Sequence, residues 1–317
     1  MTPMKENPLN KLSRDVMQAF DDLNGVHPGF RPAHAKGILL SGVFTPSPDG
    51  SGLTRAPHVH RTSTPISVRF SDFAGVPTVP DNDPNAGPRG IAIRFHLAEH
   101  VHTDIIGHSI DGFPTRTAEE FVEFLRAARQ SGAGAPKPSP IEKFLGSHPA
   151  ALEFVQAPKP FPVSFFKECF FGVNAYRFTN QSGASRYGRY RIRPEGGGEY
   201  LTAEAAAGKS ADFLFDEVRE RLMKGPAKLE ITVQLAEAGD VVDDSTVHWK
   251  EDRPQVAFGS IEVTSVVPHN QAEQRHIIFD PIPRVDGIEP SADPLLEPRA
   301  AVYLMTGRRR RADGPAR

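Results

Sequence analysis

Ile38-Leu39-Leu40-Ser41-Gly42-Val43-Phe44 is the first in a series of short apolar runs that decides the fold of this chain. Similar apolar or alternating runs follow at residues 66–70, 90–95, 103–106, 170–178, 187–192, 228–235 and 255–267. Clusters of Pro, Gly, Asp and Asn separate them, a composition typical of strands joined by turns. The series predicts about eight mostly antiparallel strands closed into a β-barrel, with a hairpin that turns at residues 180–183.

Segments with helical spacing lie before, between and after the strands. Leu9, Leu12, Val16 and Phe20 recur at such a spacing, so the chain is expected to open with an amphipathic helix that ends near Gly25. Further helices are predicted over residues 117–129, capped by Thr117, and over 210–224, beginning at a serine. Residues 131–140 are expected to form an exposed connector. The predicted fold class is therefore α+β, with residues 1–29 as a helical arm and residues 30–317 as one barrel domain that ends in a helix.

Composition and charge exclude several classes of protein. The net charge is −2 over 317 residues, so no polycationic surface for nucleic acid or anionic lipid is expected. Cys169 is the only cysteine, which excludes an intrachain disulfide framework and suits a reducing compartment. The first eight residues contain no apolar signal core, and no run approaches the length of a membrane span. We therefore expect a cytoplasmic protein.

The last predicted helix, residues 297–311, places three functional groups on one face. Pro298 suits its first position, and at the helical pitch Arg299, Tyr303 and Arg310 fall within about 40° of one another. A guanidinium one turn from a phenol favours the phenolate, and tyrosinate is a known axial ligand of haem iron. The alternative is a surface helix whose arginine-rich end lies at its negative pole.

A second group of polar residues lies where the first strands begin and end. The segment Arg31-Pro-Ala-His34-Ala-Lys-Gly37 leads into the first strand, and Arg69 and Ser71 end the second. A histidine that enters a barrel is usually structural. Here Arg31 and Arg69 would add cationic groups near the same mouth, which suits a planar ligand with carboxylates. Ser71 would fix the tautomer of the imidazole through a hydrogen bond.

These segments together resemble the haem-containing catalase family, in its short form of catalase-related peroxidases. Arg31-x-x-His34-Ala-Lys-Gly37 is similar to the distal-histidine motif of the family, and Pro65-Ile-Ser-Val-Arg69-Phe-Ser71 to the strand that follows it. Two further segments match: Gly87-Pro-Arg-Gly90-Ile-Ala-Ile-Arg-Phe95 resembles the Asp-Pro-Arg-Gly strand, and Arg299-x-x-x-Tyr303 resembles the proximal motif. The resemblance runs from about residue 31 to residue 310.

The resemblance implies a role for each of these side chains. The cofactor would be haem b, with Tyr303 as the iron ligand and Arg299 stabilising its phenolate. Propionate-binding residues would be Arg31, Arg69 and Arg310, and Phe121 would lie against the porphyrin. The catalytic residues would be His34, Ser71 and His108. The implied activity is that of a haem peroxidase reducing hydrogen peroxide or organic hydroperoxides with a small organic electron donor and weak catalase activity, in a homodimer or homotetramer.

Two departures from the family pattern shape these expectations. His108 follows Asp104-Ile-Ile-Gly107, where the family has an asparagine that positions peroxide. We therefore expect less efficient dismutation of hydrogen peroxide. The chain is also expected to end with its proximal helix, without the wrapping segment, helical domain or flavodoxin-like extension of longer members. The exposed haem edge would then suit reductants or larger peroxides.

Three other functions compete with this interpretation. His58-Val-His60 and His96-x-x-x-His100-x-His102 are alternating histidines that would bind a transition metal in a cupin-like barrel. A haem sensor or carrier would use Tyr303 and the arginines, with His108 crowding or ligating the iron. Finally, Ala33 beside His34 and an altered residue 108 would open the pocket to fatty-acid hydroperoxides, which some catalase-related proteins rearrange.

Overall fold

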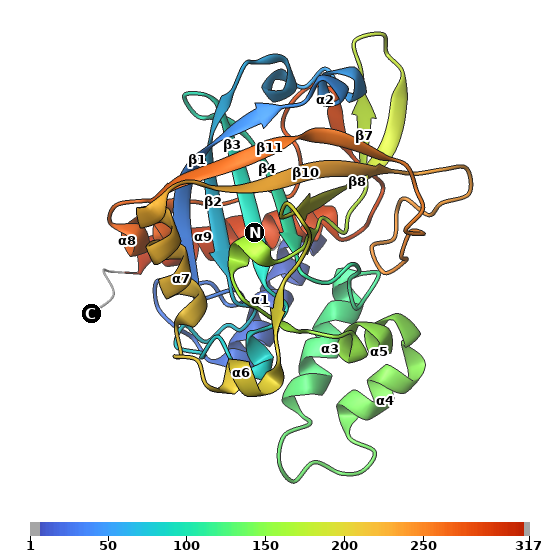
Figure 1. Ribbon diagram of the computed structural model, residues 1–317. Helices are drawn as coiled ribbons and strands as arrows, with labels where there is room; N and C mark the ends of the chain where they lie inside the picture. The colour runs from blue at the N-terminus through green and yellow to red at the C-terminus, as the bar shows by residue number, and fades with distance from the viewer. Residues whose placement is uncertain (1–6, 314–317) are drawn as a thin grey trace, which may run out of the picture.

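The computed structural model describes residues 7–313, in which one sheet closes on itself (Figure 1). The sheet runs β10-β11-β1-β2-β3-β4-β6-β8-β7-β12, and pairing of β10 with β8 closes a ring of eight strands. The ring consists of β1 (Gly37–Pro46), β2 (Thr64–Ser71), β3 (Gly90–Ala98), β4 (Val101–His108), β6 (Phe170–Phe171), β8 (Ser185–Arg193), β10 (Ala227–Leu235) and β11 (Gln255–Val266). The strands β7 (Tyr176–Thr179) and β12 (Ile288–Pro290) extend the sheet beside β8, and β5 (Phe161–Pro162) pairs separately with β9 (Tyr200–Leu201). The predicted antiparallel barrel is confirmed.

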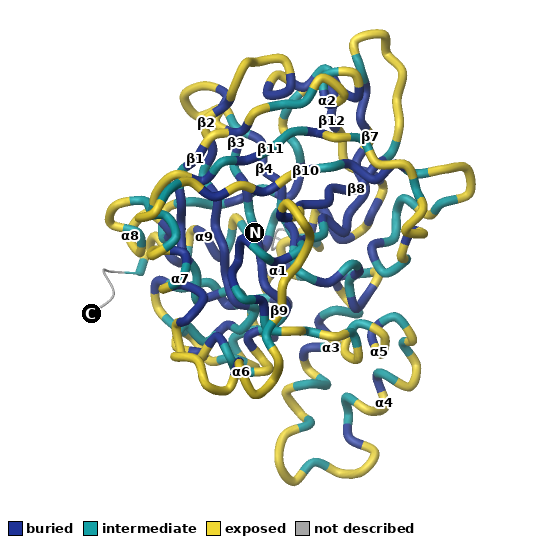
Figure 2. Tube along the Cα trace, viewed as in Figure 1, coloured by how far each residue is buried: buried dark blue, intermediate teal, exposed yellow. Residues whose placement is uncertain are grey.

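The barrel closes because alternate apolar residues of its strands turn inward. In β10, Ala227, Leu229 and Ile231 are buried, whereas Lys228 and Glu230 between them are exposed. Aromatic rings fill much of the interior, and Figure 2 shows dark blue, buried residues along the strands between teal and yellow ones. Burying one such aliphatic or aromatic side chain contributes about 1.5–3 kcal/mol. The register therefore cannot slip by one residue without turning this apolar set to solvent.

Nine α-helices surround the barrel within the described part of the chain. They are α1 (Pro8–Asn24), α2 (Pro48–Leu53), α3 (Ala118–Arg129), α4 (Pro140–Ser147), α5 (Pro149–Gln156), α6 (Ala203–Ala207), α7 (Phe213–Lys224), α8 (Asn270–His276) and α9 (Leu296–Ala312). The opening helix α1 packs on α3 and α9 through Val16, Ala19, Val122, Leu125 and Val302. The helices α3, α4 and α5 form a lobe at the lower right of Figure 1. No helix within residues 7–313 is long and apolar enough to cross a membrane.

Several element boundaries differ from those predicted. The helices α4 and α5 follow the exposed connector 131–140 and were not expected. The run 170–178 is not one strand, because it is interrupted between β6 and β7. Helix α9 begins at Leu296, so Pro298 is its third residue. Residues 1–6 begin the predicted helical arm, and residues 314–317 end the predicted barrel domain. Both segments lie outside the described residues.

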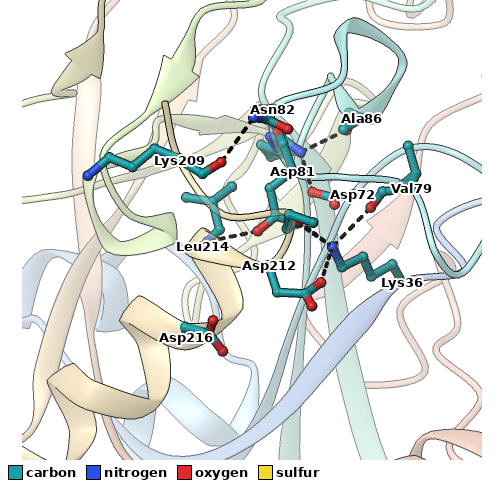
Figure 3. A network of polar contacts seen from close by, with 12 residues as sticks. Lys36, Asp72, Val79, Asp81, Asn82, Ala86, Lys209, Asp212, Leu214 and Asp216 are labelled. Atoms are coloured by element: carbon teal, nitrogen blue, oxygen red, sulfur yellow. Dashed lines mark hydrogen bonds and ion pairs between the residues drawn. The ribbon is translucent and has the colours of Figure 1, made fainter. Parts of the chain in front are cut away.

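The predicted serine cap at residue 210 was wrong, because an ionic network sets the start of α7 instead. Asp212 occupies the cap position without a side-chain cap, and its carboxylate pairs with Lys36 at 2.6 Å. Asp81 accepts a hydrogen bond from the Leu214 N–H at 2.7 Å and also pairs with Lys36 (Figure 3). The network thus joins the first turn of α7 to the segment that leads into β1.

The same network reaches the end of β2. Asp72, the residue after Ser71, is fully buried and pairs with Arg89, which also donates to the carbonyl oxygen of Ala86 at 3.1 Å. Burial raises the pKa of Asp72, although Arg89 acts in the opposite direction. A buried carboxylate that loses such a partner is strongly destabilised. Lys36, Asp72 and Arg89 therefore hold the segments on either side of β1 and β2 in place.

His58 is a buried titratable group inside the barrel and gives a pH-dependent stability. Its ring packs against Phe44, Phe95 and Phe258 at centroid distances of 5.9, 4.8 and 5.5 Å. Burial lowers the pKa of His58 to about 3, whereas histidine in an unfolded chain titrates near pH ~6.5. When the pH lies between these two pKa values, His58 binds a proton in the unfolded chain but not in the folded protein. The free energy of unfolding therefore decreases as the pH falls through this range.

We expect His58→Phe to remove this proton uptake and to reduce the acid sensitivity of the fold. For one such histidine, linkage gives a loss of about 2 kcal/mol on going from pH ~7 to pH ~5. Urea denaturation at both pH values should show that the variant loses about 2 kcal/mol less than the parent protein does. An unchanged difference between the two pH values would mean that His58 is not the group responsible.

Candidate functional site

A large cavity lies between the barrel and α9, and we call it the main cavity. It holds about 1350 Å³ of empty space counted out to its open mouth. Its wall is mainly apolar. Nine side chains singled out from the sequence all line it: Arg31, His34, Arg69, Ser71, His108, Phe121, Arg299, Tyr303 and Arg310. The structure thus brings together residues from both ends of the chain.

His34 enters the main cavity from the segment before β1. Its backbone has φ 55°, in the left-handed region, and its N–H donates to the Phe73 carbonyl at 2.8 Å. The Nδ1 atom lies 3.1 Å from Ser71 Oγ, the contact expected from the sequence. Gly90 makes room for this pair, since a Cβ there would lie 2.7 Å from Ser71 Oγ and 2.8 Å from His34 Nδ1.

The electrostatic surroundings keep the His34 imidazole neutral. Burial lowers the pKa of His34 to about 3, with further contributions from Arg69 and His108. At neutral pH the ring therefore carries one proton and retains one nitrogen lone pair. A neutral imidazole in a pocket is a proton acceptor for a bound substrate.

His108 is the second imidazole in the main cavity and ends β4. The backbone N–H of Ile110 lies 3.3 Å from its Nδ1, and its Nε2 is buried without a hydrogen-bond partner among the described residues. Burial, together with the positive charge of Arg299, lowers the pKa of His108 to about 3. A buried, neutral group with an unpaired polar atom is suited to a ligand that supplies the partner.

Tyr303 lies on α9 and is supported from behind by a chain of buried polar groups. Arg299, one turn earlier, donates from Nη2 to the Tyr303 hydroxyl oxygen at 3.2 Å. Its Nη1 donates to the side-chain oxygen of Asn174, whose amide in turn donates to Asp293 at 2.7 Å. Asp293 also accepts from the Leu295 N–H at 2.9 Å. The start of α9 is thereby tied to the loop between β6 and β7.

Three guanidinium groups gather at one side of the main cavity. Arg31 and Arg310 both donate to the carbonyl oxygen of Ile277 at 3.1 Å, and Arg69 donates from Nε to Gln274 at 2.7 Å. Burial, Arg69 and Arg310 lower the pKa of Arg31, and burial and Arg310 lower the pKa of Arg69 to about 9. Among the described residues, none of the three makes an ion pair with a carboxylate, and Arg310 Nε is buried without a partner. The cluster therefore suits a ligand that brings its own carboxylates.

Gly37 allows Arg69 to reach this cluster. A Cβ on Gly37 would lie 2.2 Å from Arg69 Nη2, which donates to the carbonyl oxygen of His34 at 2.8 Å. The Arg69 guanidinium thus holds the backbone of His34 and lies on the wall of the main cavity. Any larger residue at position 37 would displace it.

An aromatic wall completes the main cavity. Phe121 on α3 lies 5.1 Å from Phe113 and 5.7 Å from Phe20, measured between ring centroids. Together with the apolar faces of α1 and α9, these rings provide the surface that a large planar ring system needs. A phenol, two neutral imidazoles, unpaired guanidinium groups and an aromatic wall together are a donor set that fits haem.

The histidine pairs that suggested a different metal site are not assembled. His58 and His60 lie in a short 3-10 helix, Pro57–His60, and not on a strand as predicted. His96 and His102 pair across β3 and β4, but His100 lies exposed at the turn with φ 58°. Within residues 7–313, no three His, Cys, Asp or Glu side chains are grouped to hold a metal ion.

Asn174 and Asp293 are site residues that the sequence did not reveal. Both lie in loops, Asn174 is far from Arg299 along the chain, and neither residue belongs to a periodic pattern. We expect Asn174→Leu, which keeps the volume but removes the amide, to lower the free energy of unfolding by about 1–3 kcal/mol, because Arg299 and Asp293 each lose a buried partner. Urea denaturation measures this. Asn10→Leu, at an exposed position of α1, is the control, and equal stability of both variants would contradict the bridging role.

Comparison with known proteins gives matches over nearly the whole chain. Residues 16–315 match the sequence profile of the family described as Catalase. A catalase-related peroxidase of Mycolicibacterium paratuberculosis is 34% identical over 308 residues, covering 95% of this chain and 96% of that protein. A catalase-related peroxidase of Synechococcus elongatus is 31% identical over 295 residues, covering 92% and 86%.

Solved structures show the same fold. A fungal catalase superposes with a TM-score of 0.79 at 22% identity, covering 93% of this chain and 62% of that one. Catalase A from Saccharomyces cerevisiae also gives a TM-score of 0.79 at 22% identity, covering 93% and 64%. The arrangement of barrel and helices described above is therefore one that catalases share.

Proposed function

Because this chain belongs to the catalase family, as a short catalase-related peroxidase, we propose that it uses haem b to reduce organic hydroperoxides and hydrogen peroxide. One observation carries this proposal. The main cavity has His34 and His108 on its wall together with Tyr303, and three arginines without carboxylate partners. When bound, haem would supply the iron and the redox chemistry of peroxide reduction.

In this proposal His34 moves the proton. The neutral imidazole accepts the proton of the bound hydroperoxide and returns it to the oxygen that leaves. Water or an alcohol therefore departs instead of hydroxide or alkoxide, which lowers the barrier to O–O cleavage. The contact with Ser71 holds the ring in position for both transfers.

The residues on α9 and in the arginine cluster hold the cofactor. Tyr303 would bind the iron as phenolate, and Arg299 would stabilise its negative charge from 3.2 Å. Arg31, Arg69 and Arg310 would bind the propionates. The propionates would supply the negative charges that these buried guanidinium groups lack. Phe121 would pack against the porphyrin.

His108 is the proposed third catalytic residue. Its unpartnered Nε2 would meet the polar end of a bound peroxide. An imidazole is larger than the carboxamide that this position carries in the family pattern, and the surrounding wall is mainly apolar. Both features favour an organic hydroperoxide over dismutation of hydrogen peroxide.

Haem-loaded protein tests the proposal directly. We expect it to oxidise an aromatic donor in the presence of cumene hydroperoxide, and to do so faster than it evolves oxygen from hydrogen peroxide. Donor oxidation is followed by absorbance and dismutation with an oxygen electrode. Protein that carries haem but oxidises no aromatic donor with either peroxide would contradict a peroxidase function.

A further inference from the structure

A second cavity lies beside the main one, and we call it the side pocket. It holds about 640 Å³ of empty space and is lined by Ile110, Phe113, Ala150, Glu153, Phe154 and His248, among others. The pocket lies between helix α5, the segment after β4 and the loop between β10 and β11. Phe113 and Phe154 line both cavities. None of its other side chains takes part in the proposed peroxide chemistry.

Only a layer of rings separates the side pocket from the main cavity. Phe154 meets His108 edge to face at 6.2 Å between ring centroids, and Phe113 lies 5.1 Å from Phe121. His108 and Phe121 are residues of the main cavity. A molecule stacked on Phe113 or Phe154 would therefore lie one ring away from the haem site, a separation that electrons cross readily.

The mouth of the side pocket is polar. His248 Nε2 lies 3.9 Å from a carboxylate oxygen of Glu153, and both side chains are partly exposed. Gly112 makes this position of His248 possible, because a Cβ there would lie 2.6 Å from His248 Nε2. The side pocket thus combines apolar ring faces inside with an imidazole and a carboxylate at its rim.

The walls of the side pocket are fixed by hydrogen bonds. Lys159 donates to the carbonyl oxygens of Val155 at 2.9 Å and Ala157 at 3.1 Å, which ties down the end of α5. The Phe113 N–H donates to the Ser245 carbonyl at 3.0 Å and joins the opposite wall to the loop that carries His248. A pocket held in this way is already formed before a ligand arrives.

We propose that the side pocket binds the electron donor of the enzyme and that this donor is a phenol. The proposal rests on the peroxidase function above, which requires a reductant. A phenol ring would pack against Phe113 and Phe154 in the offset or edge arrangements that aromatic pairs prefer. Its hydroxyl would lie toward the His248–Glu153 pair, which takes up the proton released on oxidation.

The overall reaction balances with the donor as the only other reactant. Each phenol gives up one electron and one proton and becomes a phenoxyl radical. Two phenols therefore supply what a hydroperoxide needs for cleavage of its O–O bond to an alcohol and water. The electrons pass through the ring layer to the haem site. The two protons are released to solvent by way of His248 and Glu153, and the peroxide takes up two protons from solvent, so the sum is conserved.

Binding is tested with guaiacol and the full-length purified protein. Trp249 is the only tryptophan and directly follows His248, which lines the side pocket, so its emission is the probe of binding. We expect a saturable change in emission for the parent protein. In Ala150→Phe, which fills the pocket, the affinity should fall by about tenfold or more. Leu152→Phe adds the same ring on the exposed face of α5 and should bind like the parent. A non-saturable change, or equal affinity in parent and Ala150→Phe, would overturn the proposal.

Steady-state kinetics separate the donor site from the peroxide site. With haem-loaded Ala150→Phe we expect kcat/KM for guaiacol to fall about tenfold or more, and kcat/KM for hydroperoxide to stay unchanged. His248→Ala, which alters a partly exposed side chain, is a second variant that should slow donor oxidation alone. A loss in kcat/KM for hydroperoxide would show that the pocket admits peroxide, and would overturn the proposal. Saturable binding of guaiacol by a haem-loaded protein that turns over no peroxide would instead contradict the peroxidase function, and would reduce the side pocket to a phenol-binding site without a donor role.

Discussion

His34→Asn is expected to slow the peroxide-consuming step by about 10²–10⁴-fold, the usual contribution of a positioned acid–base group, while the protein keeps its haem. Asparagine tolerates the left-handed backbone of this position, where φ is 55°. It also preserves a polar side chain beside Ser71, so the main effect is loss of the proton acceptor. The cofactor contacts from Tyr303 and the arginine cluster remain.

Stopped-flow absorbance of the haem-loaded variant with hydroperoxide measures this effect. His100→Asn is a matched control, because His100 also has a left-handed backbone, with φ 58°, but its side chain is exposed to solvent and far from the site. We expect the control to react like the parent. A rate for His34→Asn equal to that of the parent would exclude His34 as the proton carrier.

Tyr303→Phe is expected to abolish most haem retention. The ring and its packing remain, but the oxygen that would bind iron is lost. Even the removal of a residue that supports a metal ligand commonly costs about 10–100-fold in affinity, so the removal of the ligand should cost more. Arg299 would then also keep a buried charge without the phenol at 3.2 Å.

The ratio of haem absorbance to protein absorbance after reconstitution and gel filtration measures retention. Tyr187→Phe is the control, since Tyr187 lies on β8 outside the main cavity. The control should bind haem like the parent. A Tyr303→Phe protein with the parent ratio would show that the phenol is not the iron ligand.

The barrel could be predicted from the sequence because strand formation here depends on local patterns. Apolar alternation in runs such as 38–44 and 228–235, bounded by turn residues, is enough to define strands that must bury one face. The opening helix was predicted for the same reason, and α1 ends at Asn24 with Gly25 at φ 78°. Helices α4 and α5 were missed because they are short and follow a stretch rich in Gly, Ala and Pro.

Other errors arose where tertiary contacts override local signals. The serine at 210 was expected to cap a helix, but the ion pair of Lys36 with Asp212 and the bond from Leu214 to Asp81 set the actual start. His58 was predicted to alternate with His60 on a strand, but the 3-10 helix Pro57–His60 places its ring inside the barrel. Neither the start of α7 nor the burial of His58 can be predicted from the residues next to it in the sequence.

The nine predicted site residues line one cavity. Six of them could be predicted because they occur in three of the matched motifs. The other three, His108, Phe121 and Arg310, were located by the family resemblance around those motifs. The roles of all nine remain predictions.

Asn174 and Asp293 could not be predicted from the sequence, because they act on Tyr303 only through Arg299 and come from loops without any periodicity. The side pocket likewise depends on α5 and the loop that carries His248, which meet only in the folded protein.

An absorption spectrum of the haem-loaded parent protein, taken before and after addition of hydroperoxide, tests most directly whether Tyr303 and His34 flank a reactive haem. We predict a Soret band that changes on addition of peroxide and returns when a phenol is added. A low-spin, six-coordinate spectrum that peroxide leaves unchanged would contradict the account.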